Sequence, residues 1–177
     1  MTKIRQGLIG LTLFVLTLTV SGQAQTQSTV TRVNGSSLSP ASSFIDVTGV
    51  RTYFGGFVHG QVVASTPATF TFSVAFREIG PVEGSPGIFS GSIVAPNSSF
   101  AVTQAVGRKS VTTSGTIDAG TVTYSLNPDG RAEIISIDSD NLTIWEGKNR
   151  RRTAVGNGTL DYGTVAAGAG TMVLNFF

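Results

Sequence analysis

Cysteine is absent from this chain of 177 residues. Its absence excludes disulfide bonds, thiolate metal sites, a cysteine nucleophile and lipid attachment through an N-terminal cysteine. The chain has one histidine and one tryptophan, and the patterns G-x-S-x-G, H-E-x-x-H and H-x-H do not occur in it. These patterns are common signatures of hydrolases and zinc enzymes. We therefore expect a protein without catalytic activity and without a cofactor.

Charged side chains are scarce: they make up 12% of the chain, with 12 basic and 10 acidic residues. Two of the basic residues, Lys3 and Arg5, lie in an N-terminal segment that we expect to be removed. Without them the count is 10 against 10, and the remaining chain has no formal net charge. Because a neutral chain lacks long-range attraction for polyanions, we expect no nucleic-acid partner.

Long apolar runs are also missing, apart from the stretch from Leu8 to Val20. A helix that spans a bilayer takes about 20 residues, so this stretch is too short. It lies between a basic start and the small-x-small sequence Gly22-Gln23-Ala24, which is the layout of a secretory signal peptide. We predict a signal peptide over residues 1–24 with cleavage near Ala24, and a secreted or periplasmic mature protein. An uncleaved membrane anchor is the alternative.

The chain is rich in Ser, Thr, Gln and Asn immediately after this segment. Residues 25–43 bury too little apolar surface to offset the entropy lost on ordering. We predict a flexible leader over residues 25–43, in which Thr29 to Val33 could form a short strand. A single all-β domain is expected over residues 44–177.

Strand patterns recur through this domain, and no helical period of any length occurs. The expected strands cover residues 51–65, 68–78, 87–95, 98–106, 110–117, 153–162 and 169–176, together with a meander over 120–147. Short segments rich in Gly, Pro, Asn and Asp separate them. The pattern predicts an antiparallel, meander-rich barrel or sandwich of about 8–10 strands, and it leaves the choice between the two open.

The clearest alternation of apolar and polar residues lies in residues 68–78. Phe70, Phe72, Val74 and Phe76 fall on one face of the expected strand, with small polar or small apolar residues between them. Successive side chains of a strand point to opposite faces, so the three phenylalanines are predicted to enter the core together.

The meander begins with a turn at Asn127-Pro128-Asp129-Gly130. This sequence favours a type I turn with a G1 bulge, which pairs Asn127 with Arg131. The cross-strand pairs expected from this register are Leu126–Ala132, Tyr124–Ile134 and Val122–Ser136.

A second tight turn is predicted at residues 138–141, because their side chains can hydrogen-bond the turn backbone. This turn would place Ile134 opposite Trp145 and Glu133 opposite Glu146. Two neighbouring carboxyl groups are the arrangement that most glycosidases use, so Glu133 and Glu146 are candidate site residues. A wet rim of the sheet is the simpler interpretation of the pair.

The same turn carries three oxygen ligands that Ca²⁺ favours, in Asp138, Asp140 and Asn141. The spacing lacks the glycine and the closing glutamate of an EF-hand loop, and a β-turn explains the same residues. They are therefore weak metal candidates.

The remaining candidate binding residues lie in a long strand pattern and in a basic loop after the meander. They are Tyr53, Phe57, His59, Lys148, Arg150, Arg151 and Arg152. Core packing of the aromatic rings, a histidine at a rim and a solvated loop are the alternative interpretations.

The function predicted from these observations is that of an exported, non-catalytic β-domain, a binding or structural module associated with a cell-surface component. One alternative is a small barrel that binds an apolar small molecule, because the chain is rich in phenylalanine. Another is a small outer-membrane β-barrel, which commonly ends in an aromatic residue, as this chain does at Phe177. However, Met172, Leu174 and Phe176 alternate out of phase with that residue.

Overall fold

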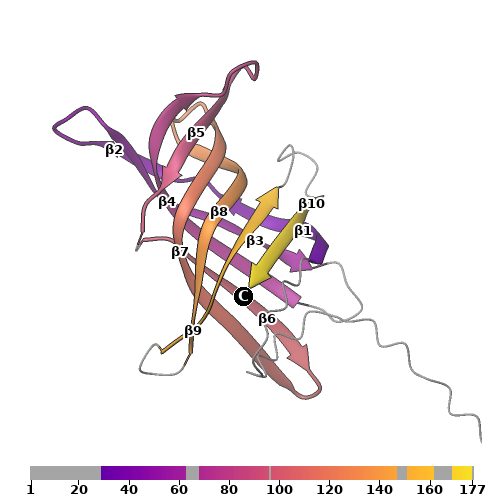
Figure 1. The fold of residues 1–177 in the computed structure, drawn as a ribbon. Coiled ribbons are helices and arrows are strands. Elements are labelled where there is room, and N and C mark those ends of the chain that lie inside the picture. The colour runs from indigo at the N-terminus through magenta and orange to yellow at the C-terminus, as the bar shows by residue number, and fades with distance from the viewer. Residues whose placement is uncertain (1–28, 63–67, 96, 147–150, 162–168, 177) are drawn as a thin grey trace, which may run out of the picture.

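The computed structural model describes residues 29–62, 68–95, 97–146, 151–161 and 169–176. Within these ranges the chain forms β-strands and no helix, and therefore no helix long and apolar enough to cross a membrane (Figure 1). The strands are β1 (Thr29–Ser39), β2 (Ser42–Ile45), β3 (Arg51–Val62), β4 (Ala68–Pro81), β5 (Ile88–Ile93), β6 (Ser99–Val106), β7 (Lys109–Leu126), β8 (Ala132–Glu146), β9 (Arg151–Asp161) and β10 (Ala169–Phe176). The prediction of an all-β fold is confirmed.

The strand pairings are antiparallel and run round a ring. The ring is β1–β3–β4–β6–β7–β8–β9–β10, and β10 pairs back to β1. Apart from the inserted β2 and β5, each strand pairs with the next strand of the chain, as in an up-and-down barrel. Closure is only partial, because β1 and β10 pair over residues 29–34 and 169–174, whereas β7 and β8 pair over residues 115–126 and 132–144.

Two long strands of the ring change partners along their length. β4 pairs with β6 over residues 68–73 and with β5 over residues 76–81. β7 likewise pairs with β6 over residues 109–116 and with β5 over residues 121–125. β5 and β6 therefore occupy opposite ends of the molecule, as Figure 1 shows. The outer face at the β6 end is made by β3, β4, β6, β7 and β8.

The core is built from the inward side of each strand. Phe70, Phe72, Val74 and Phe76 of β4 are all buried, as their alternation predicts. The residues between Phe70 and Val74, Thr71 and Ser73, point to the outer face and are half-buried. Burial of one large apolar side chain contributes about 1.5–3 kcal/mol, so β4 alone contributes several kcal/mol to folding. A mostly apolar interior and a hydroxyl-bearing exterior follow from this alternation.

The turn predicted between β7 and β8 is confirmed. The Asn127 backbone N–H donates to the Arg131 carbonyl oxygen at 2.9 Å, and the predicted pairs Leu126–Ala132 and Tyr124–Ile134 are both formed. The third predicted pair is wrong: Val122 lies opposite Ile137 rather than Ser136. A β-bulge between Thr123 and Tyr124 shifts the register, because a bulge places two residues of one strand opposite one residue of its partner.

The second predicted turn, at residues 138–141, is wrong. β8 runs through this segment as one strand and pairs with β7 on one side and β9 on the other. β7 pairs with Asp138, Ser139 and Asn141, and β9 pairs with Asp138 and Ser139, while irregularities in both pairings fall at Asp140. Ile134 and Trp145 are therefore not cross-strand neighbours.

The structure also differs from the predicted flexible leader. Residues 29–39 form β1, which pairs with β3 and with β10, and residues 42–45 form β2. The composition of a segment does not reveal the partner strands that will satisfy its backbone, and here both neighbours are available. The ordered strands thus begin before residue 44. The predicted signal peptide lies outside the described residues and stays a prediction.

Candidate functional site

An open groove of about 430 Å³ lies on the outer face of the barrel, toward the β6 end. Five strands supply its lining residues, which are Phe57, Thr71, Ser73, Ser99, Phe100, Ala101, Ser114, Gly115 and Trp145. We call it the outer groove. Its middle is made of small side chains, and a large aromatic side chain stands at each end, on β3 and on β8.

The cross-strand register explains this arrangement. Phe57 of β3 lies opposite Ser73 of β4, and Ser73 lies opposite Ser99 of β6. Ser99 in turn lies opposite Thr116 of β7. Because directly opposed residues share one face of a sheet, these four side chains form a row across the strands on the outside of the barrel.

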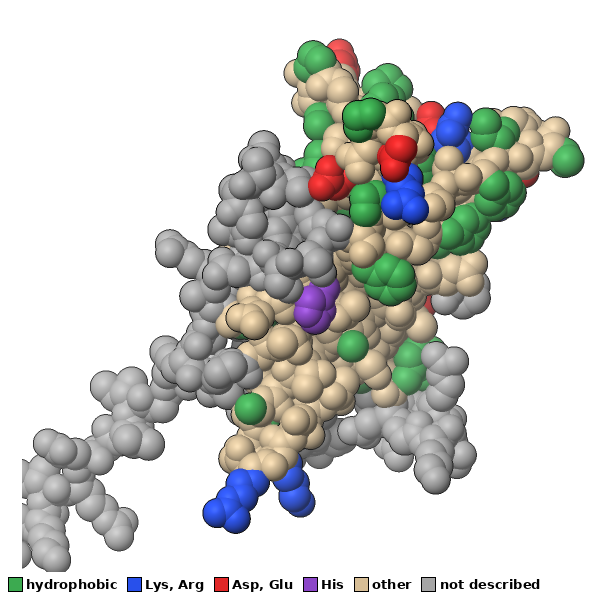
Figure 2. Space-filling view, turned by 180° about the vertical axis from the view of Figure 1, so that it is seen from behind, with side chains coloured by type: hydrophobic (Ala, Val, Ile, Leu, Met, Phe, Trp, Pro, Cys, Tyr) green, Lys and Arg blue, Asp and Glu red, His purple; other side chains and the backbone are tan. Residues whose placement is uncertain are grey.

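A second row runs beside the first. His59 lies opposite Thr71, Thr71 opposite Ala101, and Ala101 opposite Ser114. Figure 2 shows the face that carries His59, and most of the described surface next to it is neither hydrophobic nor charged. The two rows make a floor of small, mainly hydroxyl-bearing side chains.

Three hydroxyl groups of the floor are unengaged. Within the described part of the chain, the side chains of Ser73, Ser99 and Ser114 make no hydrogen bond. Each serine hydroxyl can donate one hydrogen bond and accept two. The floor therefore offers both donors and acceptors to a molecule in the groove.

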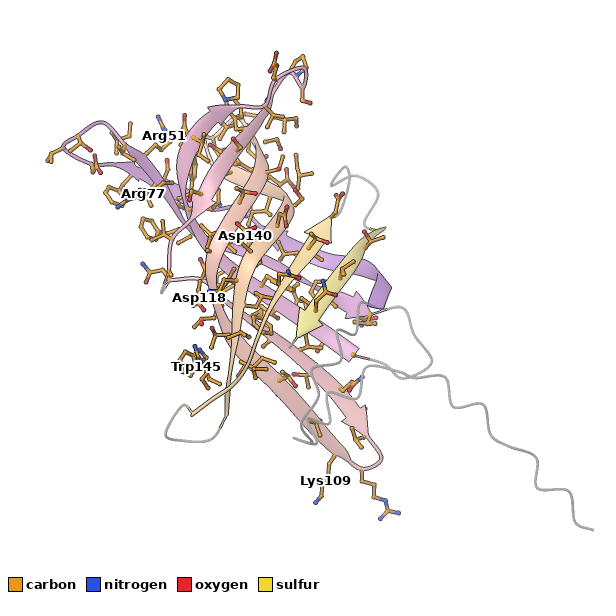
Figure 3. All side chains as sticks on the ribbon, in the orientation of Figure 1. Arg51, Arg77, Lys109, Asp118, Asp140 and Trp145 are labelled. Carbon is orange, nitrogen blue, oxygen red and sulfur yellow. The ribbon has the colours of Figure 1, made fainter. Side chains whose placement is uncertain are left out.

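The two larger polar side chains of this region are held in place by threonines. The Trp145 Nε1–H donates to Thr116 Oγ1 at 3.0 Å, and in Figure 3 the indole projects away from the ribbon of the barrel. His59 Nδ1 and Thr71 Oγ1 share a hydrogen bond of 2.9 Å. A fixed side chain loses less conformational entropy when a ligand binds against it. The Trp145 ring is in this sense pre-organised.

The described lining of the outer groove contains no Asp, Glu, Lys or Arg. Asp118 lies in the same part of the sheet, and its Oδ2 accepts a hydrogen bond of 2.5 Å from Thr143 Oγ1. The described lining therefore supplies no ionic partner to a ligand.

Groups with displaced pKa values lie elsewhere in the molecule. Burial raises the pKa of Tyr124 and that of Tyr53, which are packed together in the core. The Thr48 hydroxyl, which donates to Asp46 at 2.6 Å, lowers the pKa of that carboxyl group in the β2–β3 turn. None of these residues lines the described groove.

The structure separates the residues that the sequence analysis proposed as a site. Phe57 lies in the outer groove, with 44% of its surface exposed, and His59 borders the groove. Tyr53 is buried, and its ring stacks on Phe76 with 4.9 Å between ring centroids. Of the predicted aromatic candidates, one is therefore a groove residue and another is a core residue.

The predicted carboxylate pair is wrong. Glu133 lies near the start of β8 and opposite Ser125, while Glu146 lies at the end of the same strand and opposite Arg151. A strand rises about 3.3 Å per residue, so the two residues are separated by up to roughly 40 Å along the curved β8 (Figure 1). Joint acid/base chemistry needs carboxyl groups within about 10 Å, and the predicted cross-strand pair that would bring them together is not formed.

The weak metal candidates and the described basic residues lie on strands and do not line the outer groove. Asp138, Asp140 and Asn141 lie along β8 rather than in a turn, and no group of three potential metal ligands occurs among the described residues. Arg151 and Arg152 begin β9. Arg152 is exposed and lies opposite Trp145 of β8. Lys148 and Arg150 lie outside the described residues.

Sequence reasoning missed the hydroxyls of Ser73, Ser99 and Ser114 and placed Trp145 opposite Ile134. A weak signal was present: the strand patterns at residues 68–78 and 110–117 carry Ser or Thr at alternate positions, and Ser99 and Thr103 lie on one side of residues 98–106. What was missing was the register that aligns these positions on one outer face.

Comparisons with known proteins identified no relative of this chain. A scan of protein-family models, a search of curated proteins and a search of solved structures each found no match to this chain. The functional interpretation therefore depends on the residues of the outer groove.

Proposed function

We propose that this protein is an exported, non-catalytic binding domain that holds a neutral ligand in its outer groove. The observation that supports this most directly is the composition of the groove, with three unengaged serine hydroxyls between two aromatic side chains and no charged lining residue. Ligand sites typically combine apolar surface with a few polar groups that fix orientation. Export rests on the sequence pattern of residues 1–24.

The described lining of the groove contains no Asp, Glu or His, which supports a role without catalysis. General acid or base chemistry needs a titratable side chain within hydrogen-bond reach of the reacting atom. His59 borders the groove, and it contacts Thr71. A nucleophile–base pair also needs a third group that orients the base, and within the described residues His59 has no second hydrogen-bond partner.

The interior of the barrel offers less support for binding of an apolar small molecule. Tyr53, Phe76 and Tyr124 are buried and pack against one another, with ring centroids 4.9–5.1 Å apart. Side chains therefore fill this part of the interior, which a ligand would have to occupy. The outer groove is the more open of the two places.

The outer face is also unlike that of an outer-membrane barrel. A membrane barrel carries an apolar band on its exterior, with polar residues inside. Here the exterior of β4, β6 and β7 carries Ser73, Ser99 and Ser114, while Phe70, Phe72 and other apolar residues point inward. The hydroxyl-bearing exterior supports a surface in contact with water.

Filling the groove tests the proposal. Ala101 lies in the middle of the floor, and Ala101→Phe would fill it with a ring. Thr103→Phe is the matched control, because Thr103 lies on the same face of β6 but outside the groove. Trp145 is the only tryptophan, so its emission reports on ligands at this site.

The titration would use three uncharged probes: a neutral oligosaccharide, a monoacylglycerol and a neutral peptide. We expect at least one probe to shift the Trp145 emission of the mature chain. Ala101→Phe should weaken that binding by about tenfold or more, equivalent to about 1.4 kcal/mol, and Thr103→Phe should leave it nearly unchanged. The same affinity in both variants, or no response to any probe, would overturn the groove as the binding site.

A separate assay tests the lack of catalysis. The mature protein is incubated with oligosaccharide, ester and peptide substrates, and the products are quantified by mass spectrometry. We expect no turnover. Product formation that is lost in His59→Ala would show that the chain is an enzyme.

A further inference from the structure

The outer groove is long, neutral and aromatic at both ends, and these three properties restrict its ligand. We infer that it takes a neutral, unbranched carbohydrate chain that lies across the strands from Phe57 to Trp145. This inference rests on the proposed function, since it names the ligand class of the same groove.

The length of the groove favours a chain over a single small molecule. β3, carrying Phe57, and β8, carrying Trp145, are separated by β4, β6 and β7. Neighbouring strands are about 4.8 Å apart, so the two backbones are roughly 19 Å apart along the sheet. A ligand that contacts both aromatic side chains must therefore be extended and must cross the strands.

The ends of the groove suit sugar rings. One face of a pyranose ring presents C–H groups, which carry partial positive charge, and the face of an aromatic ring carries partial negative charge. Phe57 is 44% exposed, and the Trp145 ring is held by its hydrogen bond to Thr116. Each can stack on one sugar ring of the chain without a large loss of side-chain entropy.

The floor suits sugar hydroxyls. The unengaged hydroxyls of Ser73, Ser99 and Ser114 come from three adjacent strands, so they follow one another across the sheet. A sugar hydroxyl and a serine hydroxyl are each both donor and acceptor, and the pair can bond in either sense. A polyhydroxylated chain can therefore form hydrogen bonds with the serine hydroxyls along the whole length of the floor.

Charge narrows the class to neutral sugars. No charged side chain lines the described groove, so a uronate or a sulfated sugar would lose water without gaining a partner. Arg152 lies opposite Trp145 but is not a lining residue, and Lys109, labelled in Figure 3, lies at the far tip of the β6–β7 hairpin. Neither supplies a cation to the floor.

Two other neutral ligands fit less well. An alkyl chain would cover the serine hydroxyls of the floor without bonding them, and each buried, unpaired hydroxyl costs about 1–3 kcal/mol. A peptide that binds by strand addition needs a free sheet edge. β4 and β6 are paired on both sides at the groove, and β7 is paired on both sides from Gly115 onward, so at these positions the backbone groups are already used.

The test is a titration of the mature full-length chain, read by Trp145 fluorescence and by calorimetry. The probes are neutral hexasaccharides (cellohexaose, maltohexaose and mannohexaose), glucose, hexagalacturonate, a monoacylglycerol and a neutral peptide. We expect a neutral hexasaccharide to bind at least tenfold more tightly than glucose or hexagalacturonate. Trp145→Phe, which keeps a ring at this position, should weaken binding less than Trp145→Ala.

The outcomes separate this inference from the proposed function. If hexagalacturonate binds most tightly, or if only the monoacylglycerol or the peptide binds and Ala101→Phe abolishes that binding, the carbohydrate inference is overturned and the groove stands as a binding site. If no probe shifts Trp145 or releases heat, both are overturned. If glucose binds as tightly as the hexasaccharides, the extended chain is overturned.

Discussion

The hydrogen bond between Trp145 and Thr116 can be tested without knowing the ligand. Thr116→Val removes the hydroxyl that accepts from Trp145 Nε1 and keeps a β-branched side chain of similar shape in β7. The indole then loses this hydrogen bond. We expect the ring to become more mobile while the barrel stays folded.

The size of the effect follows from the exposure of the ring. An intramolecular hydrogen bond contributes about 0.5–1.5 kcal/mol to stability, and the lower end applies where water can replace the lost partner. Trp145 is half-buried, so its N–H can reach water. We expect a loss of about 0.5–1 kcal/mol in the free energy of unfolding, which lowers Tm by roughly 1–4 °C for a chain of this size.

The assay is steady-state and time-resolved anisotropy of the single tryptophan, together with thermal unfolding. Thr116→Ser keeps a hydroxyl and should preserve the anisotropy of the wild type. Thr112→Val is the matched control, because Thr112 lies on the same face of β7 and its hydroxyl bonds Thr103 at 2.9 Å rather than the indole. Equal anisotropy in Thr116→Val and the wild type would refute the claim that this hydrogen bond fixes the ring.

Two further predictions concern stability. Gly115→Ala places a Cβ against the Thr143 carbonyl oxygen and 2.6 Å from Phe100 Cε1. We expect the free energy of unfolding to fall by about 2–3 kcal/mol and Tm to fall by roughly 5–10 °C in thermal unfolding. The control Ser114→Ala should change Tm little. The Tyr124 hydroxyl is buried without a hydrogen-bond partner among the described residues, so Tyr124→Phe should raise the free energy of unfolding at neutral pH by about 1 kcal/mol. Burial raises the pKa of Tyr124 above the unfolded value of about 10, so the wild type should lose stability as the pH rises beyond 10. Tyr124→Phe lacks this hydroxyl and should lose less stability over the same pH range. Urea unfolding measured across this range checks the difference, and an equal decline in both proteins would contradict it.

Much of the fold could be predicted from local patterns. The alternation in residues 68–78 correctly predicted the inward side of β4, because side chains of a strand alternate whatever its partners are. The turn from Asn127 to Arg131 was also predicted correctly, because proline and glycine restrict the backbone at defined turn positions. Both features depend on interactions between residues close in sequence.

The errors arose where distant strands override local preference. Residues 138–141 favour a turn on their own, yet most of them pair with β7 or β9 as part of a strand. Residues 29–39 have the composition of a leader, yet β3 and β10 pair with them. In each case the deciding hydrogen bonds come from residues far away in the chain.

The candidate site shows the same division between sequence and structure. The sequence by itself determined an all-β chain, a neutral remainder after the predicted signal peptide, no cysteine chemistry and alternating serines and threonines on several strands. Only the tertiary structure decided that Ser73, Ser99 and Ser114 come together between Phe57 and Trp145. The physical reason is register: a shift by one residue turns a side chain to the opposite face, and register is set jointly by bulges and by partner strands.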